Sequence, residues 1–234
     1  MATANRSTNP DAPDPAERMA ELHAMLERFM HLWQERLHAP PRNDLLSMLA
    51  HDPATRTMSP QELMGNLVLL VVGGRDTTPN RMSGGVVALD ENPAQMALLR
   101  GRPALIDSLV PEIIRWQTPL AYMRRTATQD TVLGGRPTRK GDKVALWYLS
   151  GNRDEQAIRD ADRFIIDRER PRQHLSFGFG IHHCVGSRLA ELQLRVLWEE
   201  LLQRFATIEV LGPPTRVRSF LVRGFTHLMV RVNK

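Results

Sequence analysis

The residue with the clearest capacity for metal chemistry is Cys184, the one cysteine of the chain. It lies in the run Phe177-Gly178-Phe179-Gly180-Ile181-His182-His183-Cys184-Val185-Gly186, where three glycines flank it ahead of a predicted helix. Glycine permits a close approach of the backbone to a bulky group, and the amides and dipole of a helix N-terminus favour a thiolate. The run suits a thiolate ligand facing a flat metallocofactor. It suits a structural cysteine in a tight turn as well.

Zinc is not expected at this loop. His182, His183 and Cys184 are adjacent in the sequence, and consecutive residues rarely close on one tetrahedral ion. With one cysteine in the chain, an internal disulfide is also excluded.

A second motif, Gly73-Gly74-Arg75-Asp76-Thr77-Thr78, interrupts a long apolar segment over residues 63–89. Each of its two glycines costs a helix about 1 kcal/mol relative to alanine. A helix break or a packing crossing would explain them. The motif is not a phosphate-binding loop, because no Gly-Lys-Ser/Thr follows it.

A third motif pairs Glu112 with Arg115, three residues apart on one face of a predicted helix. By itself the pair fits a surface ion pair worth less than about 1 kcal/mol. Three further clusters also fit plain surface charge when each is taken alone. They are Arg124-Arg125, Asn152-Arg153-Asp154 and Asp162-Arg163-Phe164.

The elements that must position these residues are mainly helical. Apolar spacing and capping residues predict one helix over 16–37, a short one that Asn43 caps and that runs to residue 50, and a long one that Ser59 caps and Pro60 opens. Further helices are predicted from Pro93, from Pro103 to about residue 116, and over 188–205. Short strands, with Tyr148 among their residues, are predicted over 121–150, an irregular stretch over 151–175, and more strands at the C-terminus. The predicted fold class is mainly α with minor β.

Composition limits the function classes. The 234 residues are 42% hydrophobic and carry a net charge of +5, with no apolar run of the roughly 18 residues that a membrane span needs. No Lys/Arg block indicates nucleic-acid binding, and residues 1–20 lack the features of a secretory signal. A cytoplasmic location is expected. Residues 1–15 are predicted to be a flexible segment and residues 16–234 a single domain part. The basic balance fits a solvated surface or a face for an acidic protein partner.

Taken in order along the chain, these motifs resemble the C-terminal half of a cytochrome P-450. The cysteine loop meets every fixed position of the pattern Phe-x-x-Gly-x-His-x-Cys-x-Gly. The resemblance implies that Cys184 is the axial ligand of the iron of haem b, and that its sulfur donates electron density to the iron. It also implies propionate contacts for His182 and Arg125. The other implied cofactor contacts are Phe177, Gly178 and Gly186.

The resemblance gives the other two motifs roles as well. Thr77 would hydrogen-bond the dioxygen, and Asp76 would help deliver protons through water. The implied substrate pocket would include Gly73, Gly74, Leu120 and Ala121. The pair Glu112 and Arg115 would be buried and structural, with Arg163 as its third member, and would keep the loop around Cys184 rigid.

Within the family, residues 109–128 and 174–182 are most similar to bacterial alkane and fatty-acid terminal hydroxylases. That branch implies a hydrophobic small-molecule substrate, dioxygen, and electrons that pass from NADH through a ferredoxin reductase and a ferredoxin.

The chain is only about half as long as a bacterial cytochrome P-450, so the fold is expected to be incomplete, with the N-terminal helices missing. We expect a fragment, from a truncated gene or an internal start at Met1. Two alternatives remain: a truncated haem-binding remnant without catalysis, and a small helical interaction domain with a structural cysteine.

Overall fold

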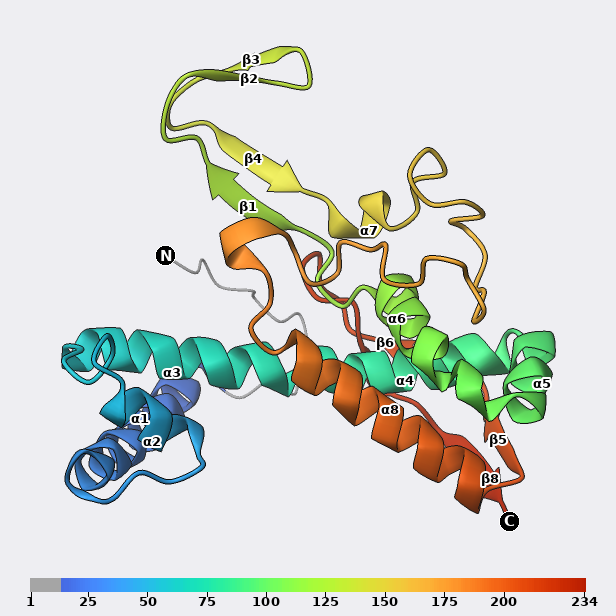
Figure 1. Ribbon diagram of the computed structural model, residues 1–234, viewed down its shortest axis with the longest axis horizontal. Helices are drawn as coiled ribbons and strands as arrows, with labels where there is room; N and C mark the ends of the chain where they lie inside the picture. The colour runs from blue at the N-terminus through green and yellow to red at the C-terminus, as the bar shows by residue number, and fades with distance from the viewer. Residues whose placement is uncertain (1–13) are drawn as a thin grey trace. The chain divides into compact units, whose positions relative to one another are not determined.

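Residues 14–234 are described by the structure, a computed structural model (Figure 1). The segment 1–15, predicted to be flexible, lies outside the described residues as far as residue 13, and Pro15 begins the first helix. The chain divides into two compact units, Met1–Arg75 and Asp76–Lys234. No helix in the described part is both long and apolar enough to cross a membrane.

The first unit contains helices α1 (Pro15–His38), α2 (Leu45–His51) and α3 (Pro60–Arg75). They enclose a small core of Trp33, Ala50, Leu63 and Leu67. As predicted, α3 begins at Pro60 and Ser59 caps it. The cap is part of a capping box, in which the Ser59 amide donates to the Glu62 carboxylate at 2.9 Å and the Glu62 amide to the Ser59 hydroxyl at 3.3 Å.

The predicted cap of α2 was wrong by one residue. Asp44, not Asn43, caps the helix, because its carboxylate accepts a hydrogen bond from the Ser47 amide at 2.8 Å. The same carboxylate pairs with Arg36 at 3.2 Å, and these contacts, led by the Ser47 amide, lower the pKa of Asp44. Two residues able to cap stood side by side, and the tertiary contact with α1 favours the second.

The second unit is built on helices α4 (Thr77–Asp90), α5 (Pro93–Gly101), α6 (Ile106–Gln117) and α8 (Ser187–Arg204). Helix α4 contacts α6 and α8, and apolar residues of all three form the main core. A Cβ on Gly85 of α4 would lie 2.8 Å from Ile113 of α6 and 3.2 Å from Trp198 of α8. The glycine therefore lets the three helices approach closely, and the core sits at their junction.

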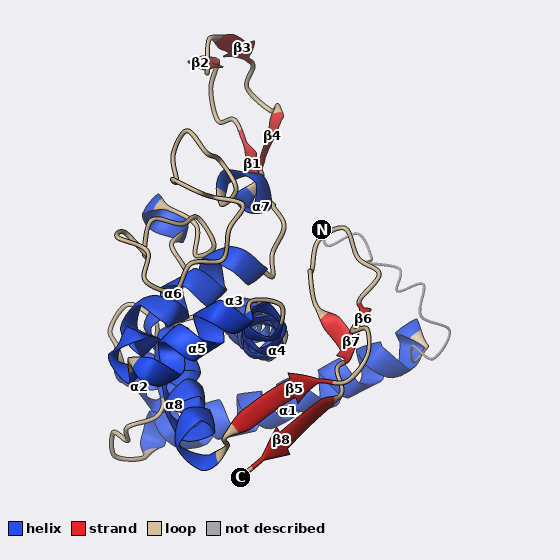
Figure 2. Cartoon of the chain, turned by 90° about the vertical axis from the view of Figure 1, so that its right-hand side faces the viewer, coloured by secondary structure: helices blue, strands red, loops and turns tan. Residues whose placement is uncertain are grey.

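Strands form four antiparallel two-stranded ribbons within the described residues, shown red in Figure 2. Strand β1 (Met123–Thr126) pairs with β4 (Lys143–Leu146), and β2 (Thr131–Leu133) with β3 (Arg136–Thr138). Near the C-terminus β5 (Thr207–Val210) pairs with β8 (Val230–Asn233), and β6 (Thr215–Arg216) with β7 (Phe225–His227). The fold class is confirmed as mainly α with minor β.

The predicted strand position of Tyr148 was wrong. It begins the short helix α7 (Tyr148–Gly151), and its side chain is buried. From Gly151 the chain follows the predicted irregular path to residue 175, with turns in place of regular elements. This meander leads into the cysteine loop, drawn in orange ahead of α8 in Figure 1.

Candidate functional site

The cysteine loop is a closed turn with left-handed glycines. Gly178 and Gly180 have φ values of +70° and +65°, a conformation that glycine adopts without steric cost. The Cys184 amide donates to the Phe177 carbonyl at 2.8 Å and so closes the loop. A Cβ on Gly178 would lie 3.2 Å from the Tyr148 hydroxyl, which leaves little space for any larger residue.

Cys184 lies at the boundary between core and surface. Its thiol is free and half-buried, and it packs against the main core, to which Phe177 belongs. The apolar side chains around it point outward: Phe179, Ile181 and Val185 are 87%, 98% and 88% exposed. A half-buried sulfur bordered by exposed apolar side chains suits a bulky apolar partner on this face.

The residues present fit a metal held by a single protein ligand. No group of three or more His, Cys, Asp or Glu residues within 14–234 could hold a metal ion. A metal bound to Cys184 would have this cysteine as its one ligand from these residues, an arrangement that the iron of a haem accepts. The sulfur also lies just ahead of α8, whose N-terminal amides favour a thiolate.

The pair Glu112 and Arg115 is buried, as the resemblance implied, and not a surface ion pair. Both side chains are fully buried, and Arg115 donates two hydrogen bonds to the Glu112 carboxylate at 2.7 and 2.8 Å. Arg115 also donates to the backbone carbonyls of Asn152, Ala161 and Arg163 at 2.7–2.9 Å. One guanidinium therefore fastens α6 to the meander.

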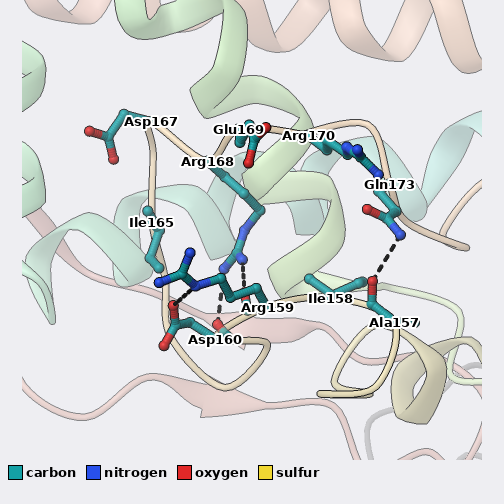
Figure 3. A pocket seen from close by; sticks show the side chains of 10 residues that line it. All are labelled: Ala157, Ile158, Arg159, Asp160, Ile165, Asp167, Arg168, Glu169, Arg170 and Gln173. Atoms are coloured by element: carbon teal, nitrogen blue, oxygen red, sulfur yellow. Dashed lines mark hydrogen bonds and ion pairs between the residues drawn. The ribbon is translucent and has the colours of Figure 1, made fainter.

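The prediction that Arg163 is the third member of this cluster was wrong. Its side chain is 73% exposed and lies 3.9 Å from Asp160, and only its carbonyl accepts from Arg115. The third member is Arg168, whose 8% exposed side chain lies 3.1 Å from the Glu112 carboxylate. Figure 3 shows the Arg168 side chain directed at the earlier part of the meander, where it donates to the Asp160 carbonyl at 3.0 Å.

A second buried network joins the meander to the start of the cysteine loop. The Asn152 amide group, fully buried, donates to the hydroxyls of Thr118 and Ser176 at 2.8 and 2.7 Å and accepts from the Leu175 amide at 2.6 Å. The Ser176 hydroxyl donates to the Ile114 carbonyl of α6 at 2.8 Å. Asn152 was singled out in the sequence only as part of a charged cluster. Its link to the loop spans 23–24 residues, which local spacing does not reveal.

His174 packs its ring against the edge of Phe177, with ring centroids 5.6 Å apart. Both ring nitrogens are buried, and neither has a hydrogen-bond partner within the part of the chain that the structure describes. Burial, and to a lesser extent the charge of Arg81, lower the pKa of His174 to about 4. The ring is therefore neutral near neutral pH.

The two predicted propionate contacts, Arg125 and His182, carry side-chain hydrogen-bond donors near the surface. Arg125 lies half-buried in β1, and its guanidinium donates to the neighbouring Arg124 carbonyl at 2.9 Å. His182 is exposed in the turn Gly180–His182. Gly186 caps α8 directly after the loop. The side chains of Arg125 and His182 are accessible to an anionic ligand, and their contact with a propionate stays a prediction.

The predicted oxygen-handling residues lie where the long apolar segment breaks. Asp76 separates α3 from α4, its side chain is exposed, and its carbonyl accepts from the Asn80 side chain at 2.7 Å. Thr77, half-buried, begins α4. Gly73 and Gly74 are exposed near the end of α3 in the first unit. A helix break was one of the two explanations that the sequence left open for the glycines, beside a packing crossing, and the structure shows the break. The roles of these residues stay predictions.

The two remaining pocket residues follow α6. Ala121 is buried at 6% exposure, and its amide donates to the Leu221 carbonyl at 2.9 Å. Leu120 forms an isolated bridge with Val222. Backbone pairing fixes both positions, and their contact with a substrate stays a prediction.

Comparison with known proteins identifies the family of this chain. Residues 102–222 match the family described as Cytochrome P-450. Linalool 8-monooxygenase of Pseudomonas putida is 40% identical over 97% of this chain and 56% of that protein. The methyl-branched lipid omega-hydroxylase of Mycobacterium tuberculosis (strain ATCC 25618 / H37Rv) is 34% identical over 95% of this chain and 52% of that protein.

Solved structures extend the likeness to the fold. Cytochrome P-450-153 from Novosphingobium aromaticivorans is 51% identical and aligns with a TM-score of 0.87 over 93% of this chain and 54% of that chain. The chain thus spans about half the length of the relatives it matches. The helix-rich fold and the ordered motifs agree, and the chain belongs to the cytochrome P-450 family.

Proposed function

We propose that this chain forms the haem-ligating part of a monooxygenase and that Cys184 is the axial ligand of the haem iron. Haem is the cofactor that membership of this family implies, and relatives are named monooxygenases. The observation that carries the proposal is the loop itself. Its half-buried cysteine is free, its backbone amide donates to the Phe177 carbonyl, and Gly178 has a left-handed conformation. When bound, haem supplies the activation of dioxygen for insertion of one oxygen atom into a C–H bond.

The surrounding residues would hold the cysteine loop in place and donate a hydrogen bond to the oxygen substrate. The buried contacts of Glu112 with Arg115 and Arg168 hold the meander against α6, and Asn152 holds the start of the loop. A ligand fixed from both sides loses little freedom when it binds iron. Thr77 would donate a hydrogen bond to the oxygen substrate.

Charged groups at the rim complete the proposed site. Asp76, exposed and next to Thr77, would exchange protons with water. Arg125 and His182 would donate hydrogen bonds to the propionates, since the half-buried guanidinium and the exposed imidazole have room for an anion.

The proposed reaction is terminal hydroxylation of an alkane or a fatty acid. The name of one relative, a methyl-branched lipid omega-hydroxylase, describes oxidation of a lipid at its end, and the sequence similarity to terminal hydroxylases points the same way. Leu120 and Ala121 would contact the hydrocarbon. We propose a cytoplasmic enzyme that receives electrons from NADH through a reductase and a ferredoxin, the latter drawn by the net charge of +5.

A haem-binding part without turnover of its own is the alternative. It is favoured by an exposed apolar stripe on α8, where Leu189, Leu192 and Val196 are 60%, 55% and 48% exposed. An apolar stripe of this kind is ordinarily covered in a working enzyme.

Turnover separates the two proposals. The haem-loaded chain is incubated with a medium-chain alkane or fatty acid, NADH, a ferredoxin and its reductase, and the terminal alcohol is quantified against NADH consumed. Thr77→Ala should lower the alcohol formed per NADH by roughly 100-fold or more, the lower end of the range for loss of a proton-transfer group, while Thr128→Ala, at an exposed loop threonine, should not. Haem uptake without any alcohol would favour the alternative.

A further inference from the structure

Arg81 is a buried cation in contact with Phe177, the first residue of the cysteine loop. It lies on α4 and is 4% exposed. Its guanidinium stacks on the ring of Phe177, 4.8 Å from the ring centroid. Its Nε has no hydrogen-bond partner among residues 14–234. A buried, incompletely paired guanidinium is costly and is retained where an anion compensates its charge.

Among the described residues, Cys184 is the one that would supply such an anion when its sulfur is a thiolate. Burial lowers the pKa of Arg81 to about 10, and the negative charge that opposes this effect is that of Cys184. His174, the other titratable neighbour, is neutral near neutral pH because its own pKa is lowered to about 4. Phe177 connects the two charges, since Arg81 stacks on its ring and Cys184 donates to its carbonyl.

We propose that Arg81 is a positioning residue, a buried counter-charge that faces the Cys184 thiolate and raises the reduction potential of the haem iron bound to it. The inference rests on the proposed function, because it needs Cys184 to be the iron ligand. Reduction adds one negative charge to the iron–thiolate centre. A fixed cation in a low-dielectric interior stabilises the more negative, reduced state, so the potential rises.

The test is the reduction potential of the haem-loaded chain, followed through the haem absorbance during a redox titration. Arg81→Met removes the charge and keeps an apolar side chain against Phe177. It should shift the reduction equilibrium by about tenfold toward the oxidised form, which is about 59 mV lower for one electron. Arg81→Lys keeps the charge and should restore most of the potential.

Arg153→Met is the matched control. Arg153 stacks on Trp116 at 3.9 Å, and burial lowers its pKa to about 10 as well, but the charges that act on it are those of Arg115, Arg223, Asp162 and Glu112. Its loss should leave the potential unchanged. Should Arg81→Met fail to fold, Arg81→Gln removes the same charge with a polar side chain and must show the same drop.

The possible failures are distinguishable. A wild-type chain that binds haem through a thiolate, with Arg81→Met or Arg81→Gln at the same potential, overturns this inference and leaves the proposed function intact. A drop of equal size in Arg81→Lys also overturns it, because the effect would then follow from packing. A wild-type chain that takes up no haem overturns both proposals.

Discussion

Replacing Arg168 by methionine should destabilise the second unit, whereas the same change at Arg163 should not. The Arg168 side chain is 8% exposed, lies 3.1 Å from the buried Glu112 carboxylate, and donates to the carbonyls of Asp160 and Arg163 at 3.0 Å. The Arg163 side chain is 73% exposed and faces Asp160 only at 3.9 Å. The two arginines lie five residues apart in the same meander, so each serves as the control for the other.

The expected loss of unfolding free energy follows from the hydrogen bonds that each variant loses and retains. Arg168→Met removes a charge-assisted hydrogen bond to Glu112, worth about 1.5–3 kcal/mol. The carbonyl acceptors near the surface regain water, and Glu112 keeps its two bonds from Arg115. We therefore expect a loss of about 2.5 kcal/mol, which lowers Tm by about 5–10 °C at this chain length. Arg163→Met should change stability by less than about 0.5 kcal/mol.

Urea unfolding followed by far-ultraviolet circular dichroism measures both variants against the wild type. Equal destabilisation by the two substitutions, or a larger loss from Arg163→Met, would refute the assignment of Arg168 as the third member of the buried cluster. A loss confined to Arg168→Met would support it.

Two further outcomes follow from the structure. In the first unit, Asp44→Ala should lower the urea midpoint while Asn43→Ala leaves it in place, because only Asp44 accepts from the Ser47 amide; the reverse order would contradict the observed cap. The pKa of His174 is about 4 in the folded chain and about 6.5 when unfolded, so the unfolded state binds more protons as the pH falls. Stability should be full above pH ~6.5 and fall by about 2 kcal/mol by about pH 5, and His174→Leu, compared by urea unfolding at both pH values, should remove that part of the dependence.

Local structure was predictable from the sequence where contacts between neighbouring residues decide it. Ser59 caps α3 and Pro60 opens it as expected, since the contacts of the cap, which join Ser59 to Glu62, lie within three residues. Pro93 likewise opens α5. The break at Asp76 follows from the glycines ahead of it, which weaken the helix.

The errors came from contacts between distant residues. Arg168 reaches Glu112 across 56 positions, and the cluster Asp162-Arg163-Phe164 offered a nearer arginine in a plausible setting. The backbone decides between them, because the Ile165 amide donates to Glu112 at 2.8 Å and the chain then turns Arg168 inward. Tyr148 was placed in a strand by alternation, although burial against the cysteine loop puts it in a short helix.

Arg81 shows the limit of pattern reading most clearly. Arginine is almost never fully buried unless it is paired, and the sequence around it gave no sign that it lies under the loop. Only the packing of α4 against Phe177 reveals it. Cys184, by contrast, was identifiable because every fixed position of its motif is local.

Ligation by Cys184 is the central claim, and the absorbance of the reduced, carbon monoxide-treated chain tests it most directly. The chain is expressed with a supply of haem beside Cys184→Ala, reduced, and exposed to carbon monoxide. The account predicts a strongly red-shifted Soret band in the wild type, because an anionic sulfur donates electron density to the iron, and its disappearance in Cys184→Ala. A red-shifted band that persists in Cys184→Ala, or a wild-type chain that takes up no haem, would contradict it.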